Sequence, residues 1–139
     1  MSEAIKLEPA SVVDVWHEVY PHLEDIQEKW PELNNWAITE VHSKLLDGEA
    51  VLYYVPEDGF AVCAPEYDDV AGEMVLFIWI AYSFGGRGAG MIQKYLPSFI
   101  EIAGELGFGG VSTVSLHPAL EKLMPLQYCR YKVRVDEEA

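Results

Sequence analysis

Apolar side chains recur at helical spacing over the first third of the chain, which predicts amphipathic helices there. Ser11 and Asp14 form a capping box at the start of the first helix, and Pro21 is expected to break or kink it. A second helix is expected over 32–47, because Gly48 suits the position after a helix end. A short strand over 4–8 is expected to precede both helices.

From residue 50 onward the pattern favours strands. Pro56-Glu57-Asp58-Gly59 is typical of a tight turn, so 50–64 is predicted as a β-hairpin. An acidic loop is expected over 65–72. The segment Met74 to Tyr82 is apolar on both faces, which predicts a central strand.

The remaining pattern predicts the rest of the sheet. We expect a helix, a strand, a helix and a strand over 89–106, 111–116, 118–128 and 131–135. A strand, a turn, a helix and a strand form a βαβ unit, so strands 74–82 and 111–116 should be parallel neighbours. The prediction is an α/β fold of the α+β type, with a twisted mixed sheet of about six strands flanked by helices, in a single domain spanning 1–139.

Charge separates the two halves of the chain. Residues 1–70 contain 16 acidic and 3 basic residues, a net charge of −13, whereas 71–139 carry only −1. An anionic ligand is therefore expected in the second half and a cationic partner at the first, although the acids can equally be read as solvated helix faces. No basic patch exists for nucleic-acid phosphates, and the longest apolar run, 8 residues, is too short to span a membrane.

The cysteines and histidines predict neither a metal site nor a disulfide framework. Cys63 and Cys129 have no zinc-ligand or CxxC spacing, and the histidines lack ligand spacing as well. The N-terminal residues have no basic and apolar regions of a secretory signal. Reduced thiols in the cytoplasm are therefore expected, with no metal.

Four glycines lie between the central strand and the next helix, at Gly85, Gly86, Gly88 and Gly90. Glycines ahead of a helix N-terminus expose backbone N–H groups and favour a bound anion, usually a phosphate; a tight turn without a ligand is the alternative. A P-loop is excluded because Met91-Ile92 follow Gly90, where Lys and Ser or Thr would be required. The dinucleotide pattern G-x-G-x-x-G fails as well.

The segment Ile78-Trp79-Ile80-Ala81-Tyr82-Ser83-Phe84-Gly85-Gly86-Arg87-Gly88-Ala89-Gly90 resembles the phosphate loop of the GCN5-related N-acetyltransferase (GNAT) family. The strand, the aromatic Phe84 and the run from Gly86 to Gly90 match that loop in register. The order of expected elements from residue 4 to 135 resembles the family's order as well. The resemblance implies the GNAT fold and acetyl-CoA as co-substrate, with a small-molecule amine or a basic peptide as acceptor. An oligomer is left open.

The resemblance also implies roles for particular residues. Acetyl-CoA would lie between strands 74–82 and 111–116. Its pyrophosphate would contact the backbone of Gly85, Gly86, Arg87, Gly88, Ala89 and Gly90, and its carbonyl would accept a hydrogen bond from the backbone near Ile80, Ala81 or Tyr82. Glu73 is the first candidate for the base that takes the amine's proton, and Glu66 the second. Tyr82, Tyr128 and His117 are candidates for the acid that protonates the thiolate.

Two departures from the family's pattern leave alternatives open. Gly85 replaces the Arg or Gln that opens the family's loop, and Met124 stands where its last helix carries the acidic Tyr. A catalytically inactive GNAT-fold binding protein, resembling trimmed phage-encoded members, is therefore the first alternative. A small module that senses an acyl-CoA is the other.

Overall fold

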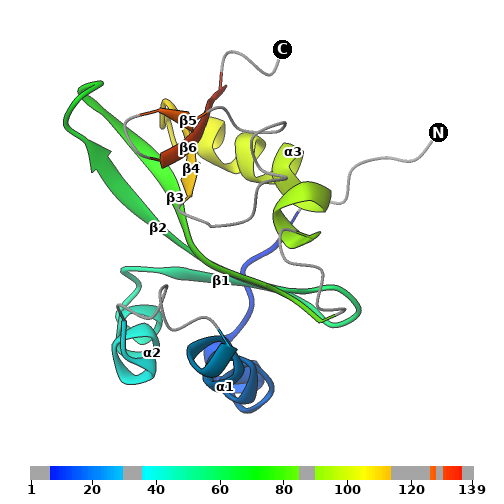
Figure 1. Ribbon diagram of the computed structural model, residues 1–139. Helices are drawn as coiled ribbons and strands as arrows, with labels where there is room; N and C mark the ends of the chain where they lie inside the picture. Colours follow the sequence, from blue (N-terminus) through cyan, green and yellow to red (C-terminus); the bar gives the residue numbers. More distant parts are fainter. Residues whose placement is uncertain (1–6, 30–35, 85–89, 114–125, 128–129, 136–139) are drawn as a thin grey trace.

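One sheet separates two layers of helices in the computed structural model, which describes residues 7–29, 36–84, 90–113, 126–127 and 130–135 (Figure 1). Helices α1 (Val12–Lys29) and α2 (Ile38–Leu46) cover one face, and α3 (Gly90–Glu105) covers the other. The strands are β1 (Val51–Val55), β2 (Gly59–Asp68), β3 (Glu73–Ser83), β4 (Gly110–Thr113), β5 (Leu126–Gln127) and β6 (Arg130–Arg134).

The sheet has six strands in the order β1-β2-β3-β4-β6-β5. Strands β3 and β4 are parallel over Val75–Ile78 and Gly110–Thr113, and every other neighbouring pair is antiparallel. The predicted mixed sheet is therefore confirmed, as is the parallel pairing of the strands on either side of α3. This pair lies in the middle of the sheet, as a βαβ connection through α3 requires.

Each face of the sheet has its own apolar core. The face toward α3 buries side chains from the helix and from β1 to β4, with Phe99, Ala103, Ala61 and Val111 fully excluded from solvent. The face toward α1 and α2 buries Val19, Leu23, Val41, Leu52, Phe60 and Val62 against the two helices. Apolar residues in β1 and β2 alternate between these cores, which is the period of two that a strand buried on both faces requires.

Strand β3 contains one extra residue, Trp79. Val62 pairs with Ile80 while Cys63 pairs with Ile78, so Trp79 has no residue opposite it on β2. Ile78 accordingly packs on the α3 side and Ile80 on the α1 side, although residues two apart in a regular strand share a face. The bulge thus turns the end of β3, including Tyr82, toward α1.

Several predicted boundaries are wrong. Helix α1 continues through Pro21 to Lys29. Strand β2 extends to Asp68, so only the last part of the expected acidic loop is a turn, and its residues 65–68 pair with β3 instead. Residues 126–127 form β5 where the helix over 118–128 was expected to continue; 114–125 lie outside the described residues.

Two helix and strand predictions near the N-terminus also need correction. Helix α2 begins at Ile38, later than the predicted start at residue 32, and residues 30–35 lie outside the described part. Of the strand expected over 4–8, residues 4–6 lie outside the described part and residues 7–8 form no strand; an isolated bridge pairs Pro9 with Tyr53. Leu7 is buried, and its backbone N–H donates to the hydroxyl of Ser98 on α3 at 2.8 Å, which ties this segment to the α3 core.

Candidate functional site

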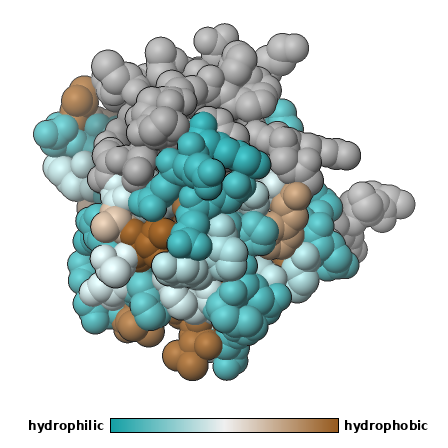
Figure 2. Space-filling model, turned by 60° about the horizontal axis from the view of Figure 1, so that its bottom comes forward, coloured by the Kyte–Doolittle hydropathy of each residue, from teal (hydrophilic) through white to brown (hydrophobic). Residues whose placement is uncertain are grey.

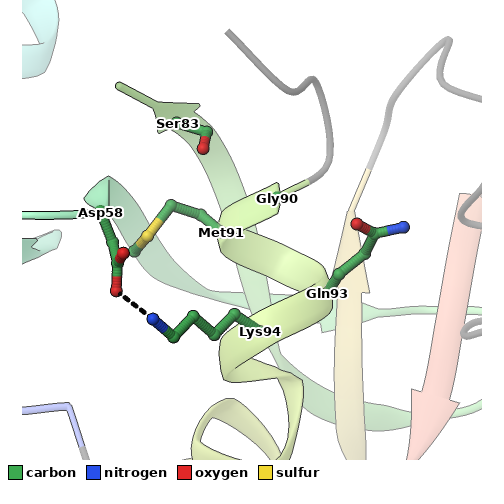
Figure 3. Close-up of a pocket in the computed structure, with 6 residues that line it drawn as sticks. All are labelled: Asp58, Ser83, Gly90, Met91, Gln93 and Lys94. Carbon is green, nitrogen blue, oxygen red and sulfur yellow. Dashed lines mark hydrogen bonds and ion pairs between the residues drawn. The ribbon is translucent and has the colours of Figure 1, made fainter. Parts of the chain in front are cut away.

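A pocket of about 340 Å³ lies at the N-terminal end of α3 (Figure 3). The turn between β1 and β2, the end of β3 and the first turns of α3 form its walls, with the lining residues Asp58, Ser83, Gly90, Met91, Gln93 and Lys94. The side chains of Met91 and Lys94 point toward Asp58, whereas Gln93 points to the other side of the helix. The pocket is within the size range of small-ligand sites.

Asp58 connects the turn to α3. One carboxylate oxygen accepts a hydrogen bond from Lys94 Nζ at 2.8 Å and another from the hydroxyl of Tyr95. The Lys94 bond, followed by the Tyr95 bond, holds the pKa of Asp58 below its usual value. The backbone carbonyl of Asp58 also accepts from the N–H of Phe84 at 2.9 Å, which fixes the turn against the end of β3. The pocket therefore contains a paired cation and anion.

Glycine is required at the turn itself. A Cβ at Gly59 would lie 2.0 Å from the carbonyl oxygen of Tyr82 and 2.9 Å from Cγ of Met91. The close approach of the turn to β3 and α3 is therefore possible only without a side chain at this position.

The N-terminus of α3 differs from those of the other two described helices. Asp14 lies in the first turn of α1 and Glu40 in that of α2, whereas the first turn of α3 contains no acidic residue. The free N–H groups and partial positive charge of a helix N-terminus favour an anion. Although the chain has a net charge of −14, the first turn of α3 therefore contains no carboxylate that would compete with a bound anion.

In the described part of the chain, β3 pairs with β4 from Val75 to Ile78, and residues 114–125 lie outside that part. At the last described pair, the Thr113 hydroxyl donates to the carbonyl of Ile78 at 2.9 Å. Strand β3 continues to Ser83, paired with β2 as far as Gly59. The bulge at Trp79 lies at the start of this extension, and a bulge leaves backbone groups outside the regular ladder.

A cluster of aromatic rings packs between the end of β3 and α1. His22 of α1 lies 4.9 Å from the ring of Tyr82 and 4.8 Å from that of Phe84, and Phe60 stacks on Tyr82 at 5.7 Å. His22 is therefore half-buried among rings. Tyr54 packs edge-on against Phe84 on the same cluster.

Two carboxylates of α1 flank these rings. The hydroxyl of Tyr82 donates to Asp25 at 2.8 Å, and that of Tyr54 donates to Glu18 at 2.9 Å. Lys29 forms an ion pair with Asp25 at 3.2 Å. The Tyr82 hydrogen bond is the main cause of the lowered pKa of Asp25, whereas burial, followed by the bond to Asp25, raises the pKa of Tyr82 to about 12. At neutral pH the pair is a protonated phenol beside a carboxylate.

The predicted bases lie elsewhere. Glu73 is the first residue of β3, nine residues before Tyr82, which is about 30 Å along an extended strand. Its carboxyl lies against Gly109, where an added Cβ would be 2.4 Å from Glu73 Oε1. Glu66 pairs with Val75 at the same end of the sheet. Neither carboxylate is near the pocket or the aromatic cluster.

The other predicted residues divide between described and undescribed parts of the chain. Ile80 is buried, Ala81 and Tyr82 are half-buried, and Gly90 begins α3 at the pocket, so these four lie at one end of the molecule. The segment 85–89, His117 and Tyr128 lie outside the described residues.

Sequence reasoning missed Asp25, Asp58 and Lys94. The pair of Asp25 with Lys29 has i,i+4 spacing on a predicted helix, so helical periodicity could have found it. No spacing pattern links Tyr82 with Asp25, 57 residues away, or Lys94 with Asp58, 36 residues away. For these two pairs, the only available signal was the concentration of acids in the first half.

Figure 2 shows the face that α1 and α2 form turned toward the viewer, with hydrophilic residues over much of it and smaller hydrophobic patches between them.

Neither the described residues nor the comparison with known proteins gives a further indication of function. In the described part of the chain, no group of His, Cys, Asp and Glu residues is arranged to hold a metal ion. None of the described helices is long and apolar enough to cross a membrane. No protein-family model matches the chain, and no curated protein matches it.

Proposed function

We propose that this chain has the GNAT fold and transfers the acetyl group of acetyl-CoA to a cationic amine. The observation that carries the proposal is the arrangement at the C-terminal end of β3. There a bulge interrupts β3, and a glycine-rich segment of the sequence leads into a helix N-terminus beside a pocket. Each feature has a use in binding a thioester that carries a pyrophosphate.

The element order supports the fold part of the proposal. Over the described residues, two helices, a hairpin, a long central strand, a helix and a parallel strand follow one another, as the resemblance to the family implies. The resemblance of the loop sequence and the order of elements are separate observations, because one rests on residue types and the other on backbone pairing.

Three features of the pocket support binding of a phosphate group. The first turn of α3 contains no carboxylate, Gly90 allows close approach to the backbone, and Lys94 Nζ lies in the pocket. Asp58 opposes this role, because its carboxylate holds Lys94 and would repel an anion. We therefore expect Lys94 to exchange Asp58 for a phosphate oxygen when acetyl-CoA binds.

Acetyl transfer requires that the thioester carbonyl is held in a fixed position and that the amine loses a proton. In the proposed reaction the amine nitrogen attacks the thioester carbonyl, a C–N bond forms, the C–S bond breaks and CoA leaves as a thiolate. Backbone N–H groups at the bulge beside Ile80 would stabilise the oxyanion. Because its pKa is about 12, Tyr82 is protonated at neutral pH and cannot take the proton of the amine. The CoA thiolate, whose ordinary pKa is about 8.5, would take its proton from water.

Asp25 is the residue that we expect to bind the cationic amine acceptor. This carboxylate stays ionised, lies beside half-buried rings and already pairs with the ammonium group of Lys29. Carboxylates and aromatic faces both attract organic cations. With Glu73 and Glu66 at the other end of the sheet, water is the remaining route for the amine's proton.

The test is a CoA-release assay with polyamines, aminoglycosides and basic peptides as acceptors. At least one amine should release CoA, and moderate salt should raise the apparent KM of the acceptor more than that of acetyl-CoA, because exposed charges are screened. Asp25→Asn should raise the acceptor KM and leave that of acetyl-CoA unchanged. Glu24→Gln, which removes the same charge from an exposed neighbouring position on α1, is the matched control.

The outcomes separate enzyme from binding protein. CoA binding without release by any amine would contradict the transferase and support the non-catalytic GNAT-fold alternative. Equal effects of Asp25→Asn and Glu24→Gln would show that only the general charge of α1 matters.

A further inference from the structure

The β2–β3 hairpin projects beyond the rest of the sheet at the end opposite the pocket (Figure 1). Strand β3 pairs with β2 along its whole length to Asp68, but β1 pairs with β2 only as far as Cys63. Among the described strands, none covers the outer edge of 64–68. This edge therefore presents backbone groups that a further extended segment could bind.

One face of this hairpin end is apolar and exposed. Tyr67 and Met74 pair across the two strands, so their side chains share a face, and they are 60% and 37% exposed. Val70 at the turn is 63% exposed. Among the described residues, most of the other large exposed apolar side chains are scattered singly, at Val13, Tyr20 and Leu46 on α1 and α2. Tyr67, Val70 and Met74 lie around one turn and therefore form a small exposed apolar cluster.

The charge around this edge selects the kind of partner. Between residues 45 and 86 the sequence contains eight acidic residues and no Lys or Arg, and four of the acids, Glu66, Asp68, Asp69 and Glu73, belong to the hairpin end. A second copy of the chain would bring a net charge of −14 against the same surface.

We infer that the hairpin end is a docking surface for a basic, extended polypeptide segment of a partner protein. The segment lies along the outer edge of 64–68, buries apolar side chains on Tyr67 and Met74, and directs its Lys or Arg side chains at the surrounding carboxylates. Backbone hydrogen bonds between the segment and 64–68 would set the register of the segment. Charge complementarity would favour basic partners over others and speed their association. This surface is separate from the proposed acetyl-CoA site and does not depend on it.

The test uses a short fluorescein-labelled peptide of alternating lysine and valine, with a glutamine–valine peptide as the uncharged control. Anisotropy at low salt should show binding of the lysine peptide, weakened by added salt, and no binding of the control. Backbone amide shifts in NMR spectra should change at Ala64 to Asp69. The double variant Tyr67→Ala/Met74→Ala should lose roughly tenfold in affinity, about 1.4 kcal/mol.

A matched control and a self-association experiment complete the design. Val13→Ala/Leu46→Ala truncates two exposed apolar side chains on the acidic helices and should bind the peptide like the wild type. Absence of binding at low salt, equal loss in both double variants, or shift changes confined to α1 and α2 would overturn the inference. So would a dimer in sedimentation equilibrium that Tyr67→Ala/Met74→Ala dissociates, because the occupant would then be a second copy.

Discussion

The two ends of strand β3 have opposite surroundings. At Ser83, the β1–β2 turn, α1 and α3 close in on the strand, and hydrogen bonds from Tyr82 and Tyr95 join elements far apart in sequence. At Glu73 the strand belongs to a hairpin with exposed apolar residues and an uncovered edge among the described strands. A single strand therefore has a pocket and packed aromatic rings at one end and an exposed hairpin at the other.

The bulge at Trp79 sets the orientation of the Ser83 end of the strand. Without the bulge, in a regularly paired strand, residues four apart share a face, so Tyr82 would point toward α3 together with Ile78. With it, Tyr82 reaches Asp25 on α1, and the rings of Phe60 and His22 pack around it. One inserted residue thus decides which helix the functional end of the strand faces.

The largest expected effect contrasts one glycine at each end of β3. Gly59→Ala puts a methyl group into the carbonyl of Tyr82, so we expect a loss of about 3 kcal/mol or more in the free energy of unfolding. Gly72→Ala meets only the Tyr67 hydroxyl at 3.9 Å, and its positive φ should cost about 1 kcal/mol. Urea unfolding of both variants measures the difference, and equal losses would mean that the two ends are packed alike.

A smaller effect is expected from the tyrosines. Tyr82→Phe should lower the free energy of unfolding by about 1 kcal/mol, because the bond to Asp25 is half-buried and charge-assisted. Tyr67→Phe, at the exposed end, should stay within about 0.5 kcal/mol of the wild type. Chemical unfolding near neutral pH provides both values.

The pKa of Tyr82 adds a pH dependence with a defined sign. Its rise from 10.0 to about 12 means that the fold favours the neutral phenol. The corresponding stability is complete below pH about 10 and is lost as the pH rises toward 12. The difference between wild type and Tyr82→Phe should therefore shrink across this interval, and a constant difference would contradict the raised pKa.

Charge changes in the pocket should alter CoA affinity in opposite directions. Lys94→Gln should weaken CoA binding by roughly three- to tenfold, since one charge-assisted contact with phosphate is lost at a partly exposed site. Asp58→Asn should strengthen it, because the competing carboxylate is removed from Lys94. Titration calorimetry measures both, and changes of the same sign would exclude the exchange of partners proposed for Lys94.

The smallest expected effect concerns Glu73. Glu73→Gln should leave turnover within about twofold of the wild type, because the carboxylate lies about 30 Å along the strand from the proposed reaction centre. Steady-state kinetics over a range of pH tests this. A tenfold loss with a shifted pH profile would restore Glu73 as the base, as the resemblance to the family first suggested.

Local patterns predicted the fold better than they predicted the site. Helical spacing, the Pro56 to Gly59 turn and the glycine-rich segment predicted the order of most described elements and the parallel pair, because these depend on neighbouring residues. Of the break or kink expected at Pro21, a break does not occur, because packing of Leu23 and Ile26 in the core outweighs the lost hydrogen bond. The uniformly apolar sequence of β3 concealed the bulge, and the pairs at Asp25 and Asp58 follow only from the folded chain.

The central claim is that the C-terminal end of β3 and the start of α3 bind the pyrophosphate of CoA. Calorimetry with free CoA tests it most directly, comparing the wild type with Gly88→Asp and with Gly107→Asp. Gly107 follows the other end of α3 and has open space for a side chain, so the control adds the same charge away from the pocket; its positive φ costs about 1 kcal/mol of stability, and urea unfolding checks that the variant is folded. We predict micromolar binding by the wild type and the control, about −8 kcal/mol, and at least a tenfold loss in Gly88→Asp, about 1.4 kcal/mol. No binding by the wild type, or equal binding by all three proteins, would contradict the claim.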